Sequence, residues 1–145
     1  SVEFVLTLKR KDFERHIGAQ KGIINVGPVK PEECPSLYQE CDGMFLPTLA
    51  ECFSASYPEA MLMKKPIVTT DLGFARNICG EAALFYEAKN AKAAAAQIQR
   101  LLGDIELQTL LVENGNNQLK SFDSPNERAK KYIELAEYLV KSLKV

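Results

Sequence analysis

The sequence predicts an α/β fold, an open parallel sheet of about five strands with helices on both faces. Short, almost continuous apolar runs recur along the chain, as they do in strands that are buried on both faces of a parallel sheet. Helical stretches separate most of these runs, which favours parallel strands joined by right-handed crossovers. The length of 145 residues suits one domain with its own core, so we predict a single domain over residues 1–145.

Five apolar runs are the candidate strands. They are VEFVLTL at 2–8, GIINVG at 22–27, GMFLP at 43–47, PIVTT at 66–70 and the weaker ALFY at 83–86. Gly27 and Pro28 end the second run, because both residue types favour turns.

The candidate helices are residues 32–41, 55–64 and the short 74–79, and from residue 90 onward the chain is largely helical. The alanine-rich stretch NAKAAAAQIQRLLGD has high helix propensity and a glycine stop at Gly103, and IELQTLLVENGNNQLKSF follows it. The last helix begins with a capping box, Ser124 with Glu127, and has a favoured proline in its first turn. Its apolar stripe is formed by Tyr132, Leu135, Ala136, Leu139 and Leu143.

The composition excludes several classes of function. The net charge is -1 and the basic residues are spread along the chain, which argues against nucleic-acid binding and against an anionic membrane surface. The N-terminus has no signal-peptide pattern, and no apolar run approaches the ~18 residues of a membrane-spanning helix. Four cysteines without metal-binding spacing and a single histidine predict no metal site, no cofactor and reduced thiols in a cytoplasmic protein.

The stretch LAECFSASYPEAM at 49–61 is the candidate site, because ligands of open parallel sheets bind outside the carboxyl ends of the strands. Glu59 completes a possible Ser56-x-x-Glu59 capping box, so helix capping alone would account for it. Glu51 is either a solvated loop residue or a ligand contact. The helix N-terminus near Ser54 and Ala55 offers amides for a phosphate, and a carboxylate on each side could accept hydrogen bonds from sugar hydroxyls.

At this stretch the sequence resembles the donor-binding domain of family 4 of the retaining glycosyltransferases, which are two-domain GT-B enzymes. The family hallmark is a glutamate, seven residues and a second glutamate followed by Ala-Met. Glu51 and Glu59 have that spacing, and Phe53 falls on the family's phenylalanine. Upstream, INVGPV is similar to the family's strand-Gly-x-Val turn, and SLYQECDGMFLPT to its helix and strand ending Pro-Ser/Thr. The resemblance runs from about residue 23 to residue 103.

The resemblance implies roles for the matching residues. Glu59 would bind the nucleotide ribose, and Glu51 would contact the donor sugar. The backbone near Phe53, Ser54 and Ala55 would hold the sugar hydroxyls and the diphosphate. The turn containing Gly27 and Val29 would lie against the base.

The implied ligands are a UDP-, GDP- or ADP-sugar donor and a glycan or polysaccharide acceptor. The implied enzyme transfers a hexose-type sugar, needs no metal and uses no catalytic residue that we assign in this chain. Its expected location is the cytoplasm, with a membrane-peripheral full-length protein as the alternative.

Two departures from the family pattern change these expectations. Cys52 and Ser54 stand where the family usually has glycines, which leaves the identity of the sugar open. The family also has an N-terminal acceptor domain, and a strand and helix before VEFVLTL that supply basic residues for the diphosphate. We therefore expect a fragment of a larger enzyme that is inactive alone. The absent central strand would leave a gap in the sheet, and we expect a dimer that fills this gap or a rearrangement of the strands.

Two other functions stay open as alternatives. The chain could be a non-catalytic α/β module that binds a nucleotide or a protein, and an adjoining N-terminal domain in the gene would discriminate against this reading. A receiver-type signalling domain needs an acidic pair after its first strand, where this chain has Lys9, Arg10 and Lys11. We expect Asp71 to be a turn residue, whereas for Arg76 a structural role and a place near the donor sugar stay equally open.

Overall fold

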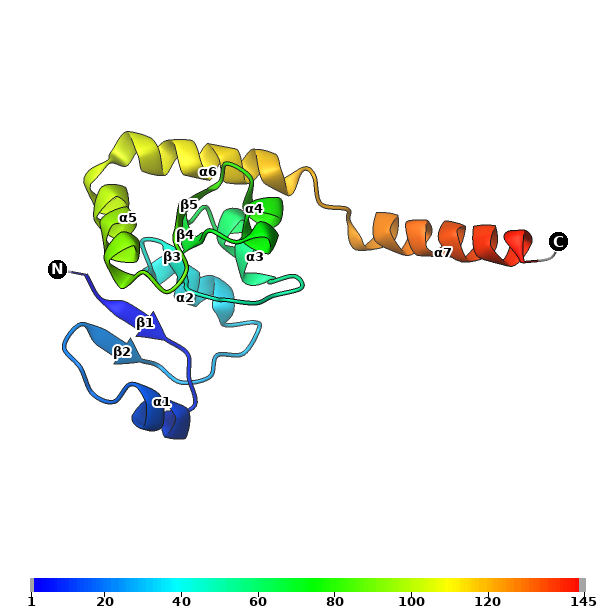
Figure 1. The fold of residues 1–145 in the computed structure, drawn as a ribbon. Coiled ribbons are helices and arrows are strands. Elements are labelled where there is room, and N and C mark those ends of the chain that lie inside the picture. Colours follow the sequence, from blue (N-terminus) through cyan, green and yellow to red (C-terminus); the bar gives the residue numbers. More distant parts are fainter. Residues whose placement is uncertain (1, 144–145) are drawn as a thin grey trace. The chain divides into compact units, whose positions relative to one another are not determined.

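The structure is a computed structural model that describes residues 2–143 (Figure 1). The chain divides into two compact units, Ser1–Cys41 and Asp42–Val145, which we describe one at a time. The prediction of a single domain stays a prediction beside this division.

The first unit contains β1 (Phe4–Leu6), α1 (Arg10–His16), β2 (Ile23–Asn25) and α2 (Cys34–Glu40). The two strands are parallel, with Phe4 opposite Ile23 and Leu6 opposite Asn25. The side-chain amide of Asn25 accepts a hydrogen bond from the Leu8 amide and donates one to the Leu8 carbonyl, both at 3.0 Å. This pair of bonds fixes the two strand ends against each other.

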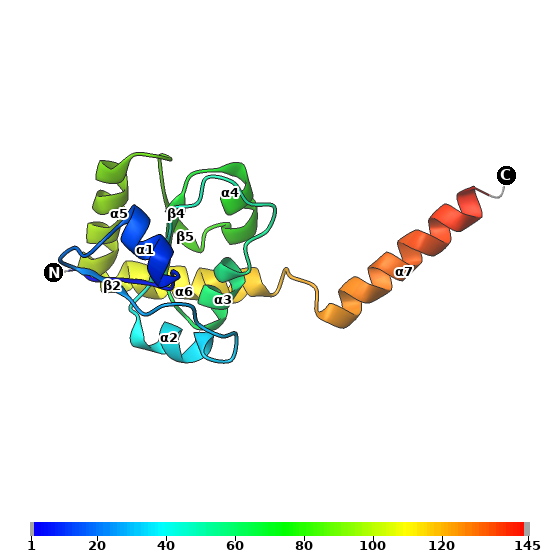
Figure 2. The same ribbon diagram turned by 90° about the horizontal axis from the view of Figure 1, so that it is seen from below.

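The second unit contains a three-stranded parallel sheet in the order β3 (Met44–Leu46), β4 (Ile67–Thr70) and β5 (Ala83–Tyr86). Its helices are α3 (Ser56–Leu62), α4 (Gly73–Cys79), α5 (Ala91–Gly103), α6 (Ile105–Leu119) and α7 (Pro125–Ser142). Figures 1 and 2 show the sheet between α5 on one side and α3 and α4 on the other. The central strand, β4, is buried over its whole length.

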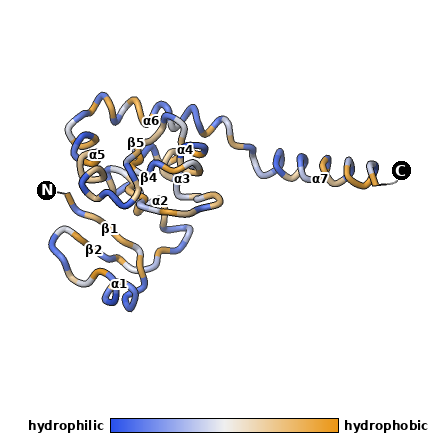
Figure 3. Tube along the Cα trace, viewed as in Figure 1, coloured by the Kyte–Doolittle hydropathy of each residue, from blue (hydrophilic) through white to orange (hydrophobic). Residues whose placement is uncertain are grey.

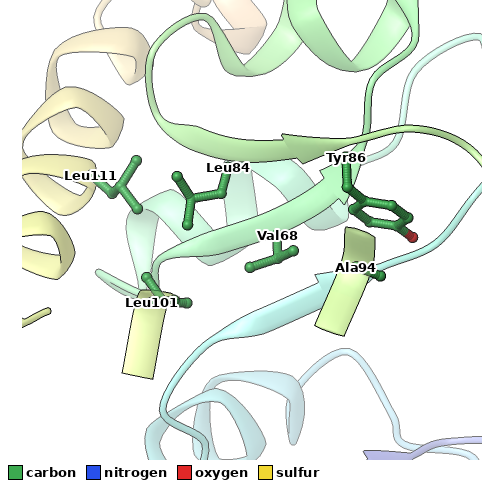
Figure 4. Packing of buried hydrophobic residues seen from close by; sticks show 6 residues of the cluster. All are labelled: Val68, Leu84, Tyr86, Ala94, Leu101 and Leu111. Carbon is green, nitrogen blue, oxygen red and sulfur yellow. The ribbon is translucent and has the colours of Figure 1, made fainter. Parts of the chain in front are cut away.

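The two faces of the sheet form the core, because side chains of a strand alternate between its faces. On one face Val68, Leu84 and Tyr86 pack against helices α5 and α6 (Figure 4). The helix residues of this cluster are Ala94, Leu101 and Leu111. On the other face Thr69 meets Tyr57, a fully buried residue of α3. Strand β4 is therefore covered on both sides, which accounts for the apolar Ile67 and Val68 and for the hydrogen bonds of the buried Thr69 and Thr70.

The late helices start where the sequence indicated. Asn90 and Asp104 cap α5 and α6 by accepting hydrogen bonds from amides three residues later. The capping box of Ser124 and Glu127 opens α7, as predicted. The predicted apolar stripe of α7 is exposed in this structure, with Tyr132 at 67% exposure as one example, and Figure 3 shows the alternation of hydropathy along this helix.

The predicted fold class is confirmed, since five parallel strands alternate with helices. The strands form two sheets, β1-β2 and β3-β4-β5, instead of one. The first four are also shorter than their apolar runs, because only three or four residues of each run have a paired neighbour, whereas β5 matches its predicted run, residues 83–86. Within residues 2–143, no helix is both long enough and apolar enough to cross a membrane.

Candidate functional site

The loop between β3 and α3 carries most of the predicted site residues. Glu51, Phe53 and Ala55 are exposed and Ser54 is half-buried. Glu59 follows within α3 and is also exposed. The structure thus presents both carboxylates to solvent, one on each side of the same short turn. Gly27 and Val29 belong to the other unit, where they follow β2.

The predicted capping box at the start of α3 is wrong. The N-cap residue is Ala55, with φ -62° and ψ -23°, and no side chain caps the helix. Ser56 already lies inside the helix, so it cannot act as the N-cap residue whose oxygen closes the box. The Glu59 amide instead donates a helical bond of 3.0 Å to the Ala55 carbonyl. Capping therefore does not account for the Glu59 carboxylate.

Glu51 is attached to the end of the sheet through Thr48. The hydroxyl Oγ1 of Thr48 lies 3.3 Å from Oε1 of Glu51 and donates to it. The main chain of Thr48 is fixed in turn by Thr70 at the end of β4, whose hydroxyl donates to the Thr48 carbonyl at 2.7 Å. Glu51 is thus an exposed loop residue with one hydrogen bond, from Thr48, so solvation and a ligand contact both stay open for its carboxylate.

A second hydroxyl chain holds the start of α3 against the sheet. Thr69 donates its hydroxyl hydrogen to the Leu46 carbonyl at 2.9 Å, and the Tyr57 oxygen lies 2.8 Å from the same threonine oxygen. Because a hydroxyl has one hydrogen and Thr69 uses it on a carbonyl, Tyr57 must be the donor. Burial raises the pKa of Tyr57, so its hydroxyl keeps that hydrogen well into the alkaline range.

Two further contacts shape the loop and its surroundings. The Phe53 ring packs edge-on against Phe122 with 6.1 Å between ring centroids, which ties the loop to the segment that follows α6. Cys52 is exposed, whereas Cys79 is buried and burial raises its pKa to about 12. The raised pKa keeps the Cys79 thiol protonated at neutral pH, which argues against Cys79 as a nucleophile.

Asp71 and Arg76 pair with each other beside the end of β4. The guanidinium donates twice to the carboxylate, through Nε to Oδ1 and through Nη2 to Oδ2 at 2.7 Å. These bonds lower the pKa of Asp71, and the guanidinium carbon also lies 4.5 Å from the Phe85 ring centroid. Arg76 is thereby committed to a bidentate pair and a stacked ring, which supports the structural role over the ligand contact for both residues.

In the first unit, Gly27 has φ +82°, a conformation that glycine adopts without strain. A hollow of about 550 Å³ lies beside this turn. Its lining includes Arg10, Phe13, Ile23, Gly27 and Pro28. Val29 is half-buried and adjacent in the chain.

The loop can bind a polar ligand but holds no obvious reaction centre. Carboxylates accept hydrogen bonds from hydroxyl groups, and main-chain amides donate them to oxygen atoms of a ligand. Within residues 2–143, no group of three His, Cys, Asp or Glu side chains is placed to hold a metal ion.

Sequence reasoning missed the four hydroxyl residues that anchor the loop. They are Thr48, Tyr57, Thr69 and Thr70. One signal could have found part of this set. Two consecutive threonines end an otherwise apolar strand, and buried hydroxyls need hydrogen-bond partners.

Comparison with known proteins gives matches of sequence and of fold. A family model described as "Glycosyl transferases group 1" matches residues 4–104. A curated relative from Campylobacter jejuni, N,N'-diacetylbacillosaminyl-diphospho-undecaprenol alpha-1,3-N-acetylgalactosaminyltransferase, is 31% identical over 109 residues, which are 74% of this chain and 29% of the relative.

Two solved structures show the same fold. The sucrose-phosphate synthase of Thermosynechococcus elongatus matches with a TM-score of 0.76 at 21% identity, over 91% of this chain and 34% of that chain. The Anabaena protein HepE, solved in complex with UDP, matches with a TM-score of 0.71 at 20% identity, over 88% of this chain and 35% of that chain. The chain therefore spans about a third of the length of each protein it matches here.

Proposed function

The chain belongs to the glycosyl transferases of group 1, and from this premise we propose that it is the donor-binding part of a retaining enzyme. The full-length enzyme transfers a hexose-type sugar from a nucleoside diphosphate to a glycan or polysaccharide acceptor. The acceptor binds through an N-terminal domain outside this chain. We propose that this chain alone is inactive in transfer, since it spans only about a third of the length of the proteins that it matches.

The observation that carries this proposal is the placement of the two glutamates. Glu51 and Glu59 are both exposed and flank one turn at the carboxyl end of β3, where open parallel sheets bind their ligands. Glu51 is anchored to the sheet by Thr48, and Glu59 is not used as a helix cap. Two acceptor groups at such an edge suit a ligand that is rich in hydroxyl groups.

In the proposed binding mode each residue has one task. Glu59 accepts hydrogen bonds from the ribose hydroxyls, and Glu51 accepts them from the donor sugar. The main chain at Phe53, Ser54 and Ala55 contacts the sugar and the diphosphate. Gly27 and Val29 lie against the base. The protein contributes orientation and electrostatic complementarity around the departing diphosphate, with no metal.

The names of two matched proteins support parts of this proposal. HepE was solved with UDP, which supports a nucleotide ligand, and the Campylobacter relative is named as an N-acetylgalactosaminyltransferase that acts on a diphospho-undecaprenol-linked sugar, which supports sugar transfer to a glycan. We place UDP first among UDP, GDP and ADP for this reason. We place the full-length protein in the cytoplasm, or at the membrane periphery if its acceptor is lipid-linked like that of the Campylobacter relative.

The test is a ligand-detected NMR titration of the chain with UDP, GDP, ADP and their glucose conjugates. One nucleotide should bind, and Glu59→Ala should weaken it about tenfold, as expected for lost hydrogen bonds to a charged group. Glu106→Ala is the matched control, since Glu106 is an exposed glutamate in the first turn of another helix, α6.

A nucleotide that binds equally to the chain and to Glu59→Ala would contradict the role of Glu59. If none of the six ligands binds, this chain is a scaffold or a protein-binding module. Donor binding would then have to be tested on the full-length protein.

A further inference from the structure

We propose that Thr48 is a positioning residue, held in place by Thr70, that orients the carboxylate of Glu51 toward the hydroxyl groups of the donor sugar. This inference rests on the proposed function, because it concerns the same site. It assigns a task to two threonines that do not themselves touch the ligand.

Each threonine hydroxyl has a single hydrogen, and this determines which groups donate and which accept in the two hydrogen bonds. Thr70 uses its hydrogen on the Thr48 carbonyl at 2.7 Å, since a carbonyl can only accept. Thr48 has two acceptors within reach, Oε1 of Glu51 at 3.3 Å and the Ala50 carbonyl at 3.5 Å. The charged and nearer oxygen is the better acceptor, so the Thr48 hydrogen points to Glu51.

Thr70, which fixes the main chain of Thr48, lies in a rigid part of the structure. Thr70 is only 1% exposed and is the last residue of β4, the central and fully buried strand of its sheet. Its neighbour Thr69 binds the Leu46 carbonyl at 2.9 Å, so both threonines hold the main chain at the end of β3. The main chain of Thr48 is therefore fixed, although Thr48 lies in a loop.

The Thr48 hydrogen bond restricts the side-chain conformation of Glu51. An exposed glutamate has many rotamers, and a ligand that needs one of them must order the side chain when it binds. The Thr48 bond holds Oε1 in advance and leaves Oε2, with both of its lone pairs, for the ligand. Thr48 thus lowers the cost of binding the sugar and has no direct effect on the nucleotide, which Glu51 does not contact.

The experiment compares UDP with UDP-glucose as probes, using the full 145-residue chain. Thr48→Val keeps the shape of the side chain and removes the hydroxyl. It should weaken UDP-glucose about fivefold and leave UDP within about twofold, because the ligand must then order the Glu51 side chain when it binds. Thr48→Ser restores the hydroxyl and should return the affinity for UDP-glucose to within about twofold of the original value.

Two controls separate positioning from a loss of structure. Thr109→Val removes an exposed hydroxyl on α6 and should change neither affinity. In a background that already carries Glu51→Ala, Thr48→Val should have no further effect on UDP-glucose, because Thr48 acts through that carboxylate. A far-ultraviolet circular dichroism melt of each variant confirms that it is folded at the temperature of the titration.

The outcomes distinguish this inference from the function on which it rests. Equal weakening of UDP and UDP-glucose by Thr48→Val, or failure of Thr48→Ser to rescue, would overturn the positioning role while leaving donor binding intact. Unchanged binding of both probes to Thr48→Val would do the same. Failure of the unsubstituted chain to bind either probe, or the GDP and ADP counterparts, would remove donor binding by this chain and the inference with it.

Discussion

The buried hydroxyl pair of Tyr57 and Thr69 makes a sharp prediction about stability. Phenylalanine in place of Tyr57 removes one donor, while Thr69 still donates to the Leu46 carbonyl at 2.9 Å. The loss is one net hydrogen bond, and we expect Tyr57→Phe to lower the free energy of unfolding by about 1 kcal/mol.

We expect Thr69→Val to lower the free energy of unfolding more than Tyr57→Phe does. Tyr57 is 0% exposed, so its hydroxyl would be left in the core without the acceptor that it has now. The Leu46 carbonyl would lose its side-chain donor as well. We expect Thr69→Val to cost about 2–3 kcal/mol, because an unsatisfied buried group pays its full desolvation penalty.

The double variant distinguishes this reasoning from a simple loss of volume. When Tyr57→Phe is already present, Thr69→Val leaves no tyrosine hydroxyl without an acceptor. The loss of free energy of unfolding caused by Thr69→Val should then be smaller by about 1 kcal/mol. Urea denaturation followed by circular dichroism measures all four proteins, with a slope of about 1–3 kcal/mol/M for a protein of this size. Thr109→Val is the exposed control and should stay within about 0.5 kcal/mol. Additive single effects, or a larger loss for Tyr57→Phe than for Thr69→Val, would refute the assignment of Tyr57 as donor.

Three further predictions concern packing, capping and thiol chemistry. Gly115→Leu should destabilise the chain by about 2 kcal/mol in urea denaturation, because a Cβ there would already lie 3.2 Å from an α3 side chain; an unchanged midpoint would contradict this close approach. Ser124→Ala should lower the stability of α7 by about 1 kcal/mol, seen as faster hydrogen exchange in that helix alone. Hydrogen bonds from Ser124 lower the pKa of Glu127. The cap therefore stabilises α7 fully above the ordinary pKa of glutamate, and this stability is lost as the pH falls through the lowered pKa. A hydrogen-exchange rate in α7 whose pH dependence shows no such loss would count against this prediction. A thiol reagent at pH 8 should modify the exposed Cys52 and spare Cys79, whose pKa is about 12; mass spectrometry of the labelled native chain decides this.

The prediction from sequence succeeded where a pattern is local. The capping box of α7 depends on Ser124 and Glu127 alone, and the short apolar runs identify all five strands. The same method failed at Ser56 and Glu59, which have the spacing of a capping box. There the helix begins one residue earlier, with Ala55 in the N-cap position, and its first turn carries Tyr57, which is hydrogen-bonded to the sheet through Thr69.

The amino-acid sequence by itself determined the α/β fold, the order of the elements and the loop that carries Glu51 and Glu59. These depend on hydrophobic periodicity and on spacing, which a chain holds without reference to distant residues. Only the tertiary structure decided how that loop is held. Thr48 and Thr70 are 22 residues apart, and their hydrogen bond exists only once β3 and β4 pair. Tyr57 and Thr69 are 12 residues apart, and theirs exists only once α3 packs on β4. The sequence does not indicate the hydrogen-bond partner of a hydroxyl, because the partner is the carbonyl or carboxylate that the fold brings within about 3 Å.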